Sequence, residues 1–126
     1  MLSTMGHEEI IEYLRSNPLE EEKCREYLID SNFPFVVHTI SQLTGRYVEV
    51  ENSEELSIGL MAFNEAITRF EPSRGAAFLS FAKLVITSRI RDYLNREKNN
   101  NNKTKTLKIT ILFNSKILLF FKNIAK

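Results

Sequence analysis

Apolar side chains recur at spacings of three and four residues along most of the chain, and this spacing restricts the fold more than any other feature. One stretch shows it at Leu56, Leu60, Phe63, Ile67 and Phe70. The period matches one face of an α-helix. The chain also holds only 4 glycines and 3 prolines, too few for many short strands joined by turns. We therefore predict an all-α fold, a compact bundle of about five helices.

Residues that begin or end helices separate the apolar stretches from one another. Asn52 with Glu55 forms a capping-box pattern at the start of the fourth helix, and Ser53 is an alternative cap. Pro72 and Gly75 both break helices, so the fourth helix ends before them. We expect the five helices at about residues 4–16, 18–30, 31–45, 53–70 and 76–97.

The fifth predicted helix has an apolar face and a polar face. Lys83, Thr87 and Arg91 lie four residues apart and form a polar row, which Leu84 and Ser88 flank. An ordinary solvated helix face has the same pattern, so the row alone does not identify a binding surface. The buried stripe is expected to contain Phe78, Phe81, Ala82, Val85, Ile86, Tyr93 and Leu94.

Charge is distributed very unevenly along the chain, although the net charge is only +1. Residues 1–56 hold 4 basic and 12 acidic side chains, a balance of −8. Residues 57–97 hold 6 basic and 4 acidic side chains, and residues 98–126 hold 7 lysines and no acid. This asymmetry suggests an acidic half that meets a basic protein and a later half that can approach a polyanion. A simple solvated surface gives the same distribution, and on charge alone it is the favoured interpretation.

Cysteine and histidine residues argue against a disulfide or a metal site. Cys24 is the only cysteine, so an internal disulfide is excluded and a reducing cytoplasm is indicated. His7 and His38 lie far from it in sequence, which argues against zinc. The sequence shows no nucleophile–base set and no phosphate-cradling glycine loop. We therefore expect no enzyme, no cofactor, no metal and no small-molecule substrate.

The composition changes abruptly after Glu97, which divides the chain into a helical domain at 1–97 and a tail at 98–126. The tail contains 7 Lys, 6 Asn, 4 Ile and 3 Phe, and it includes four consecutive asparagines. One interpretation is a basic amphipathic appendage that contacts nucleic acid or a membrane surface. The favoured interpretation is a frameshift product, because these residue types all have codons rich in A and T.

Four motifs occur in a fixed order within residues 25–97. They are I-D-S-N-F-P-F-V-V at 29–37, E-E-L-S-I-G-L at 54–60, F-E-P-S-R-G at 70–75 and F-L-S-F-A at 78–82. In this order and spacing, the set resembles region two of the sigma-70 family. It looks most like the heat-related sigma-I group. The resemblance implies a sigma factor that directs RNA polymerase to promoters during transcription initiation.

The resemblance implies that the fourth helix docks on the coiled-coil of the β′ subunit of the polymerase core. Glu51, Glu54 and Glu55 match positions that contact basic residues there, with Leu56 beside them. The sequence carries Glu54 where the family commonly has Gln, and Leu56 where it commonly has Gly. A simpler role for these acids is to complement the helix dipole, worth about 0.3–1 kcal/mol each.

The resemblance also implies that the fifth helix reads the minus-ten element of promoter DNA and traps a flipped base. Phe81 matches the aromatic position near that trap. Leu84 and Val85 match two positions where housekeeping members carry tryptophan, and the chain has no tryptophan. Each lost stacking platform costs about 1–3 kcal/mol per base, which favours a stringent alternative sigma factor. The implied DNA contacts are Phe81, Lys83, Leu84, Thr87, Ser88, Arg91 and Arg96.

Family members continue into a second domain that reads the minus-thirty-five element, and nothing after Glu97 resembles it. One hypothesis is therefore a truncated paralogue that binds polymerase but initiates poorly. A rival is a helical interaction module that binds core polymerase or an anti-sigma factor without promoter activity. The sigma-I resemblance also implies a membrane-anchored anti-sigma factor as a partner.

Overall fold

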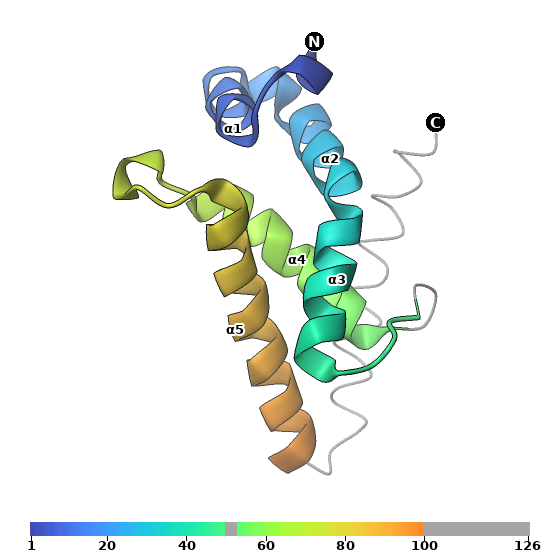
Figure 1. Ribbon diagram of the computed structural model, residues 1–126. Coiled ribbons are helices and arrows are strands. Elements are labelled where there is room, and N and C mark those ends of the chain that lie inside the picture. Colours follow the sequence, from blue (N-terminus) through green and yellow to red (C-terminus); the bar gives the residue numbers. More distant parts are fainter. Residues whose placement is uncertain (50–52, 100–126) are drawn as a thin grey trace.

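All regular elements in the described part of the chain are helical. The computed structural model describes residues 1–49 and 53–99. Within them lie five α-helices, which confirms the predicted all-α bundle (Figure 1). They are α1 (His7–Ser16), α2 (Glu21–Ser31), α3 (Phe33–Thr44), α4 (Glu54–Arg69) and α5 (Phe78–Asn99), with short 3-10 turns η1 (Leu2–Thr4), η2 (Pro18–Glu20) and η3 (Pro72–Arg74).

Three helices enclose the main core. α4 crosses between α3 and α5, and its apolar stripe faces both of them (Figure 1). Phe63 and Ile67 of α4 are completely buried, as are Ile40 of α3 and Ile86 of α5. α4 approaches α3 most closely at Gly59, where an added Cβ would lie 2.5 Å from Cδ1 of Ile40. The buried residues of α4 are those at the three- and four-residue spacings of the sequence, so this spacing decides which face of α4 is buried.

α1 and α2 form a pair that covers one end of this core. α1 lies above the corner at which the chain passes from α4 to α5 (Figure 1). Ile10, Ile11 and Leu14 of α1 are at most 2% exposed. His7 at the start of α1 makes a hydrogen bond of 3.2 Å to Asn32, and its ring lies 5.8 Å from that of Phe78.

Caps and breaks explain the helix boundaries. Ser53 caps α4, because its Oγ accepts a hydrogen bond of 3.0 Å from the backbone N–H of Leu56. The alternative cap, Asn52, lies outside the described residues. Gly45 and Gly75 have φ angles of 70° and 83°, a left-handed conformation that suits glycine and ends the preceding element.

The observed boundaries differ from the predicted ones by a few residues. α1 begins at His7 and not near residue 4, because Leu2–Thr4 form a separate 3-10 turn before Gly6. Pro18–Glu20 likewise form a 3-10 turn ahead of α2. α5 begins at Phe78 and continues to Asn99, two residues beyond its predicted end.

The buried stripe of α5 also differs in part from the prediction. Phe78, Ala82, Val85, Ile86 and Tyr93 are buried as expected. Phe81 and Leu94 are only partly buried, and Ile90, which the predicted stripe omitted, is fully buried. No helix in the described residues is long and apolar enough to cross a membrane. The tail from residue 100 onward lies outside the described residues.

Candidate functional site

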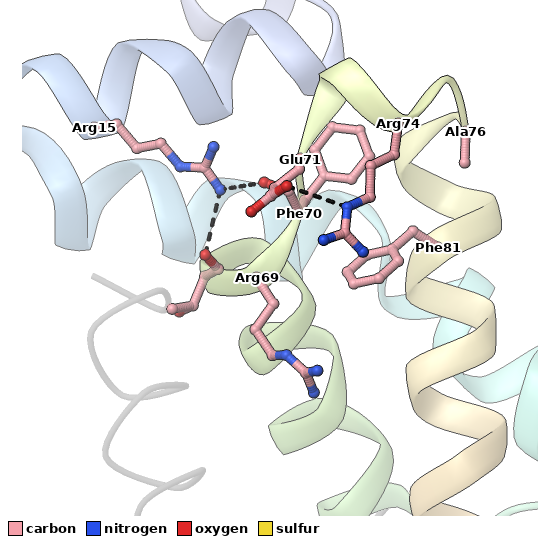
Figure 2. A pocket seen from close by; sticks show the side chains of 8 residues that line it. Arg15, Arg69, Phe70, Glu71, Arg74, Ala76 and Phe81 are labelled. Atoms are coloured by element: carbon pink, nitrogen blue, oxygen red, sulfur yellow. Dashed lines mark hydrogen bonds and ion pairs between the residues drawn. The ribbon is translucent and has the colours of Figure 1, made fainter.

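A hollow of about 410 Å³ opens at the corner between α4 and α5, below α1. Figure 2 shows Arg15 on the α1 side and Arg74 on the opposite side, with Phe70 and Glu71 between them. We call this hollow the corner pocket. Its lining residues are Arg15, Thr68, Arg69, Phe70, Glu71, Arg74, Ala76 and Phe81.

Aromatic rings form the apolar wall of the corner pocket. The rings of Phe70 and Phe81 have centroids 5.9 Å apart and are tilted by 47°. Phe70 also meets Phe78 edge to face, with centroids 5.4 Å apart. Phe70 and Phe78 are at most 2% exposed, whereas Phe81 is only partly buried. Phe81 therefore offers ring surface to the pocket while its neighbours hold it from behind.

Charged groups line the other sides of the pocket. Nε of Arg74 donates to Glu71 at 3.2 Å across the η3 turn. Nη2 of Arg15 donates to the backbone oxygens of Ile67, Thr68 and Phe70, at 3.2, 3.3 and 2.6 Å. With Arg69, three guanidinium groups and one carboxylate line the pocket, which favours an anionic ligand that also presents hydrogen-bonding edges.

Sequence reasoning missed Arg15 as a pocket residue. Glu71 and Arg74 were noted only as part of the F-E-P-S-R-G motif. Arg69 was not among the predicted site residues. The F-E-P-S-R-G motif was the signal available for Glu71 and Arg74. Arg15 gave no such signal, because it reaches carbonyl groups more than fifty residues later in the chain.

A surface row on α5 continues from the pocket along the helix. Lys83, Ser88, Arg91 and Arg96 are exposed, and Thr87 is partly buried. Leu84 is 68% exposed, an unusual environment for a large apolar side chain. Leu84 and Ser88 follow Phe81 by three and seven residues and so share its side of the helix, and Lys83, Thr87 and Arg91 form a neighbouring row. The α5 row is Lys83, Leu84, Thr87, Ser88, Arg91 and Arg96.

One ion-pair network fixes α5 against α4. Arg89 contacts Glu65 through two nitrogens, Nε at 3.2 Å and Nη2 at 2.5 Å. Arg69 donates to the same carboxylate at 3.0 Å. Partial burial tends to raise the pKa of Glu65, but hydrogen bonds from both arginines outweigh it and lower that pKa overall. The carboxylate is therefore held in its charged form between the two helices.

The start of α4 holds the carboxylates that sequence reasoning assigned to polymerase. Glu54 accepts a hydrogen bond from the hydroxyl of Tyr93, and Glu55 forms an ion pair with Arg46. The side chain of Glu55 is only 13% exposed. These residues border an open groove of about 440 Å³, which we call the amino-terminal groove. Its lining residues are Ile40, Thr44, Arg46, Tyr47, Val48, Glu49, Ser53, Glu54, Glu55 and Tyr93.

Two other residues were predicted to bind polymerase, but the described lining of the amino-terminal groove beside Glu54 and Glu55 does not include them. Leu56 is 3% exposed and packs in the core, so it supports α4 and presents almost no surface to a partner. Glu51 lies outside the described residues. The structure thus brings Glu54 and Glu55 together at one groove, at the opposite end of α4 from the corner pocket.

Comparison with known proteins identifies the family of this helical unit. The family described as sigma-70 region 2 matches residues 28–100, more than half of the chain. The chain belongs to the sigma-70 family. Its match to region 2 covers α3, α4 and α5, with both the corner of Phe70 and Glu71 and the α5 row. α1 with Arg15 lies before the matched residues.

Curated relatives of this sigma-70 family member are SigI-type sigma factors. RNA polymerase sigma factor SigI2 of Acetivibrio thermocellus is 46% identical over 78 residues, 62% of this chain and 29% of the relative. SigI6 of the same organism is 42% identical over 94 residues, 75% of this chain and 36% of the relative. SigI of Bacillus subtilis is 43% identical over 70 residues, 56% of this chain and 28% of the relative. The chain spans about a third of their length.

Proposed function

We propose that this chain is the promoter-reading domain of a sigma factor, which binds core RNA polymerase and opens the minus-ten element for transcription initiation. The observation that carries the proposal is the corner pocket, in which the partly exposed ring of Phe81 faces charged groups. The SigI-type relatives support the same role, since each is named an RNA polymerase sigma factor.

The corner pocket has the chemistry that an unstacked base requires. A flipped base needs an aromatic surface for stacking and polar groups for its edge. Phe81 offers the surface, while Glu71 and Arg74 offer an acceptor and donors beside it. Backbone phosphates on either side of the base are anionic, so the guanidinium groups at the rim favour them. In this proposal the pocket holds one base of the non-template strand.

The α5 row is the proposed track for the DNA beside that base. Lys83, Arg91 and Arg96 are exposed cations along one helix, suited to phosphate contacts that fix register. Thr87 and Ser88 supply hydroxyl groups between them. These contacts position the strand so that one base reaches Phe81.

The amino-terminal groove is the proposed docking surface for the β′ coiled-coil. Glu54 and Glu55 lie in the first turn of α4, where the helix dipole also favours negative charge. The basic partner would compete for carboxylates that Tyr93 and Arg46 engage in the free chain. We further propose action in the cytoplasm, a stress-related regulon and control by a membrane-anchored anti-sigma factor, all from the sigma-I resemblance.

Binding of single-stranded DNA tests the promoter-reading proposal. The probes are fluorescent single strands of about 12 nucleotides, selected from a random pool for binding to this chain with core polymerase. We expect Phe81→Leu to weaken binding roughly 5- to 150-fold, the loss of one stacked base. The matched control is Phe35→Leu, since Phe35 is a partly buried phenylalanine of α3. Equal binding by wild type and Phe81→Leu would contradict a base at Phe81.

A second candidate function is a helical interaction module that binds core polymerase or an anti-sigma factor without promoter activity. The observation that favours it is Leu84, because an exposed aliphatic side chain stands where stacking would need an aromatic ring. The same experiment separates the two functions. Tight binding of core polymerase without selection of any single-stranded probe would favour the interaction module.

A further inference from the structure

We propose that Arg15 of α1 is a positioning residue for the corner pocket, although it lies before the residues that match the sigma-70 family. The inference rests on the proposed function, because it concerns how the pocket holds a base. Arg15 would act through the corner between α4 and η3, which carries Phe70 and Glu71. It would thereby set the geometry at Phe81 without itself contacting the base.

The first step is the contact between Arg15 and the end of α4. The last carbonyl groups of an α-helix have no partner within the helix and carry partial negative charge. Nη2 of Arg15 donates to three oxygens there, those of Ile67, Thr68 and Phe70. The shortest of these bonds, 2.6 Å to the oxygen of Phe70, is drawn in Figure 2. A cation from another helix therefore caps α4 at the residue where the chain turns.

The second step leads from that carbonyl group to the stacking surface. Phe70 is 1% exposed, and its ring lies against both Phe78 and Phe81. Its backbone is in an extended conformation, with φ −63° and ψ 134°, so helical hydrogen bonds no longer fix its carbonyl group. Arg15 supplies the constraint that the helix has lost. Holding the backbone of Phe70 holds its ring, and the ring of Phe70 supports that of Phe81.

Nothing else in α1 reaches the pocket in this way. The neighbouring contact of α1, between His7 and Phe78, lies at the other end of the helix. Ile10, Ile11 and Leu14 anchor α1 in the core, so Arg15 projects from a fixed base. All three hydrogen bonds come from one nitrogen, Nη2, of a planar guanidinium group, whereas a lysine ammonium is a more strongly hydrated point charge.

A coupling experiment separates positioning from general stability. Each chain is bound to core polymerase and titrated with two single strands, the selected probe and the same probe with an abasic site at the flipped position. The ratio of the two affinities measures the base contact alone. For wild type we expect a ratio of roughly 5 to 150, from stacking of one base. We expect Arg15→Gln to bring this ratio close to one while core binding changes little. The melting temperature also falls, because three hydrogen bonds at the end of α4 are lost, but both affinities are measured on the same chain and their ratio is independent of that fall.

The matched control is Arg69→Gln, which removes one positive charge from the same pocket without touching the three carbonyl oxygens. It should weaken both probes equally and leave the ratio unchanged. Arg15→Lys keeps the charge and should give a ratio between those of wild type and Arg15→Gln. If Arg15→Gln does not fold, the ratio measured for Arg15→Lys tests the inference in its place.

Two outcomes would overturn the inference in distinguishable ways. A wild-type ratio near one would remove the base pocket, and the proposed function with it. A wild-type ratio above five that persists in both Arg15 variants would leave the pocket standing and refute the role of Arg15.

Discussion

The hydrogen bond between Tyr93 and Glu54 joins residues that lie 39 positions apart. Burial raises the pKa of the Tyr93 hydroxyl well above its ordinary value, and the neighbouring carboxylates of Glu54, Glu97 and Glu55 raise it further. The hydroxyl therefore stays protonated and remains a donor at every physiological pH. Glu54 is held as an acceptor at the rim of the amino-terminal groove.

Removing this hydroxyl tests its role at the level of one residue. We expect Tyr93→Phe to lower the free energy of unfolding by about 1 kcal/mol, because Glu54 loses a donor while remaining partly buried. Affinity for core polymerase should fall several-fold, since Glu54 is no longer held in place. Urea denaturation and a core-binding titration measure the two effects. The control is Tyr27→Phe, which alters a partly buried tyrosine of α2 that does not line the groove; equal stability losses in both variants would refute the contact.

Helices α4 and α5 are fixed to each other by a charge contact as well as by the core. Glu65 bridges Arg89 of α5 and Arg69 of its own helix. Its pKa lies below the ordinary value of 4.5 in the folded chain. The folded state thus favours the charged carboxylate. Its contribution to stability is complete above pH 4.5 and is lost as pH falls through the lowered pKa.

The contribution of the Glu65 carboxylate to stability can be measured as a pH-dependent difference in the free energy of unfolding between wild type and Glu65→Gln. At pH 7 we expect Glu65→Gln to be less stable than wild type by about 0.5–1 kcal/mol, a modest value because the groups are partly exposed. The difference should shrink towards zero at an acidic pH below the lowered pKa of Glu65, where wild type is also neutral at this position. Denaturant unfolding at both pH values measures it. Glu21→Gln, which alters the looser 3.8 Å pair with Arg25, should show little difference at either pH.

The helices were predictable because their apolar residues lie at helical spacings. Leu56, Leu60 and Phe63 mark the buried face of α4 directly, and the structure buries all three. The close approach at Gly59 was not predictable, because it depends on where Ile40 of another helix lies. Ile90 was missed because two arginines flank it, although its position on the helix face buries it completely.

The candidate site was predictable only where a motif recorded it. Phe81 and the polar residues after it were assigned to DNA by the resemblance to sigma-70 region two, because the four-residue spacing alone also fits a solvated helix face. Arg15 and Tyr93 act through contacts across 55 and 39 residues, and no local pattern encodes such distances. The order of the motifs therefore predicted the surface, whereas the contacts that hold it required the fold.

At the scale of the whole molecule, a group of exposed acids and a row of exposed cations lie on different helices. Glu8, Glu9 and Glu12 of α1 and Glu21 and Glu22 of α2 are exposed acids. The α5 row carries exposed cations and lies on another helix. A polyanion is therefore repelled by one part of the surface and attracted by another, which orients the chain before any specific contact forms.

The salt dependence of DNA binding tests this division of charge. Affinity for single strands should fall as salt concentration rises. Lysine and arginine side chains that contact phosphates release the counterions condensed there, and this release is less favourable in more concentrated salt. We expect Lys83→Gln to reduce the slope of log affinity against log salt by about 0.7, the value for one phosphate contact on a single strand. Lys23→Gln removes an exposed lysine of α2 and should leave the slope unchanged. Identical slopes for wild type and Lys83→Gln would exclude a phosphate contact there.

α5 has a further consequence because one rigid helix carries both Phe81 and Tyr93. The two residues are separated by about 18 Å along the helix axis, at the rise of an α-helix. In the proposed function, a base at Phe81 and polymerase near Tyr93 therefore contact the same helix, so a movement of α5 at one site also moves the other. Thermodynamic linkage makes any coupling reciprocal, so a DNA strand that strengthens polymerase binding is itself held more tightly by the same factor. A change of promoter preference in such a chain would also change how well it competes for a limited supply of core enzyme.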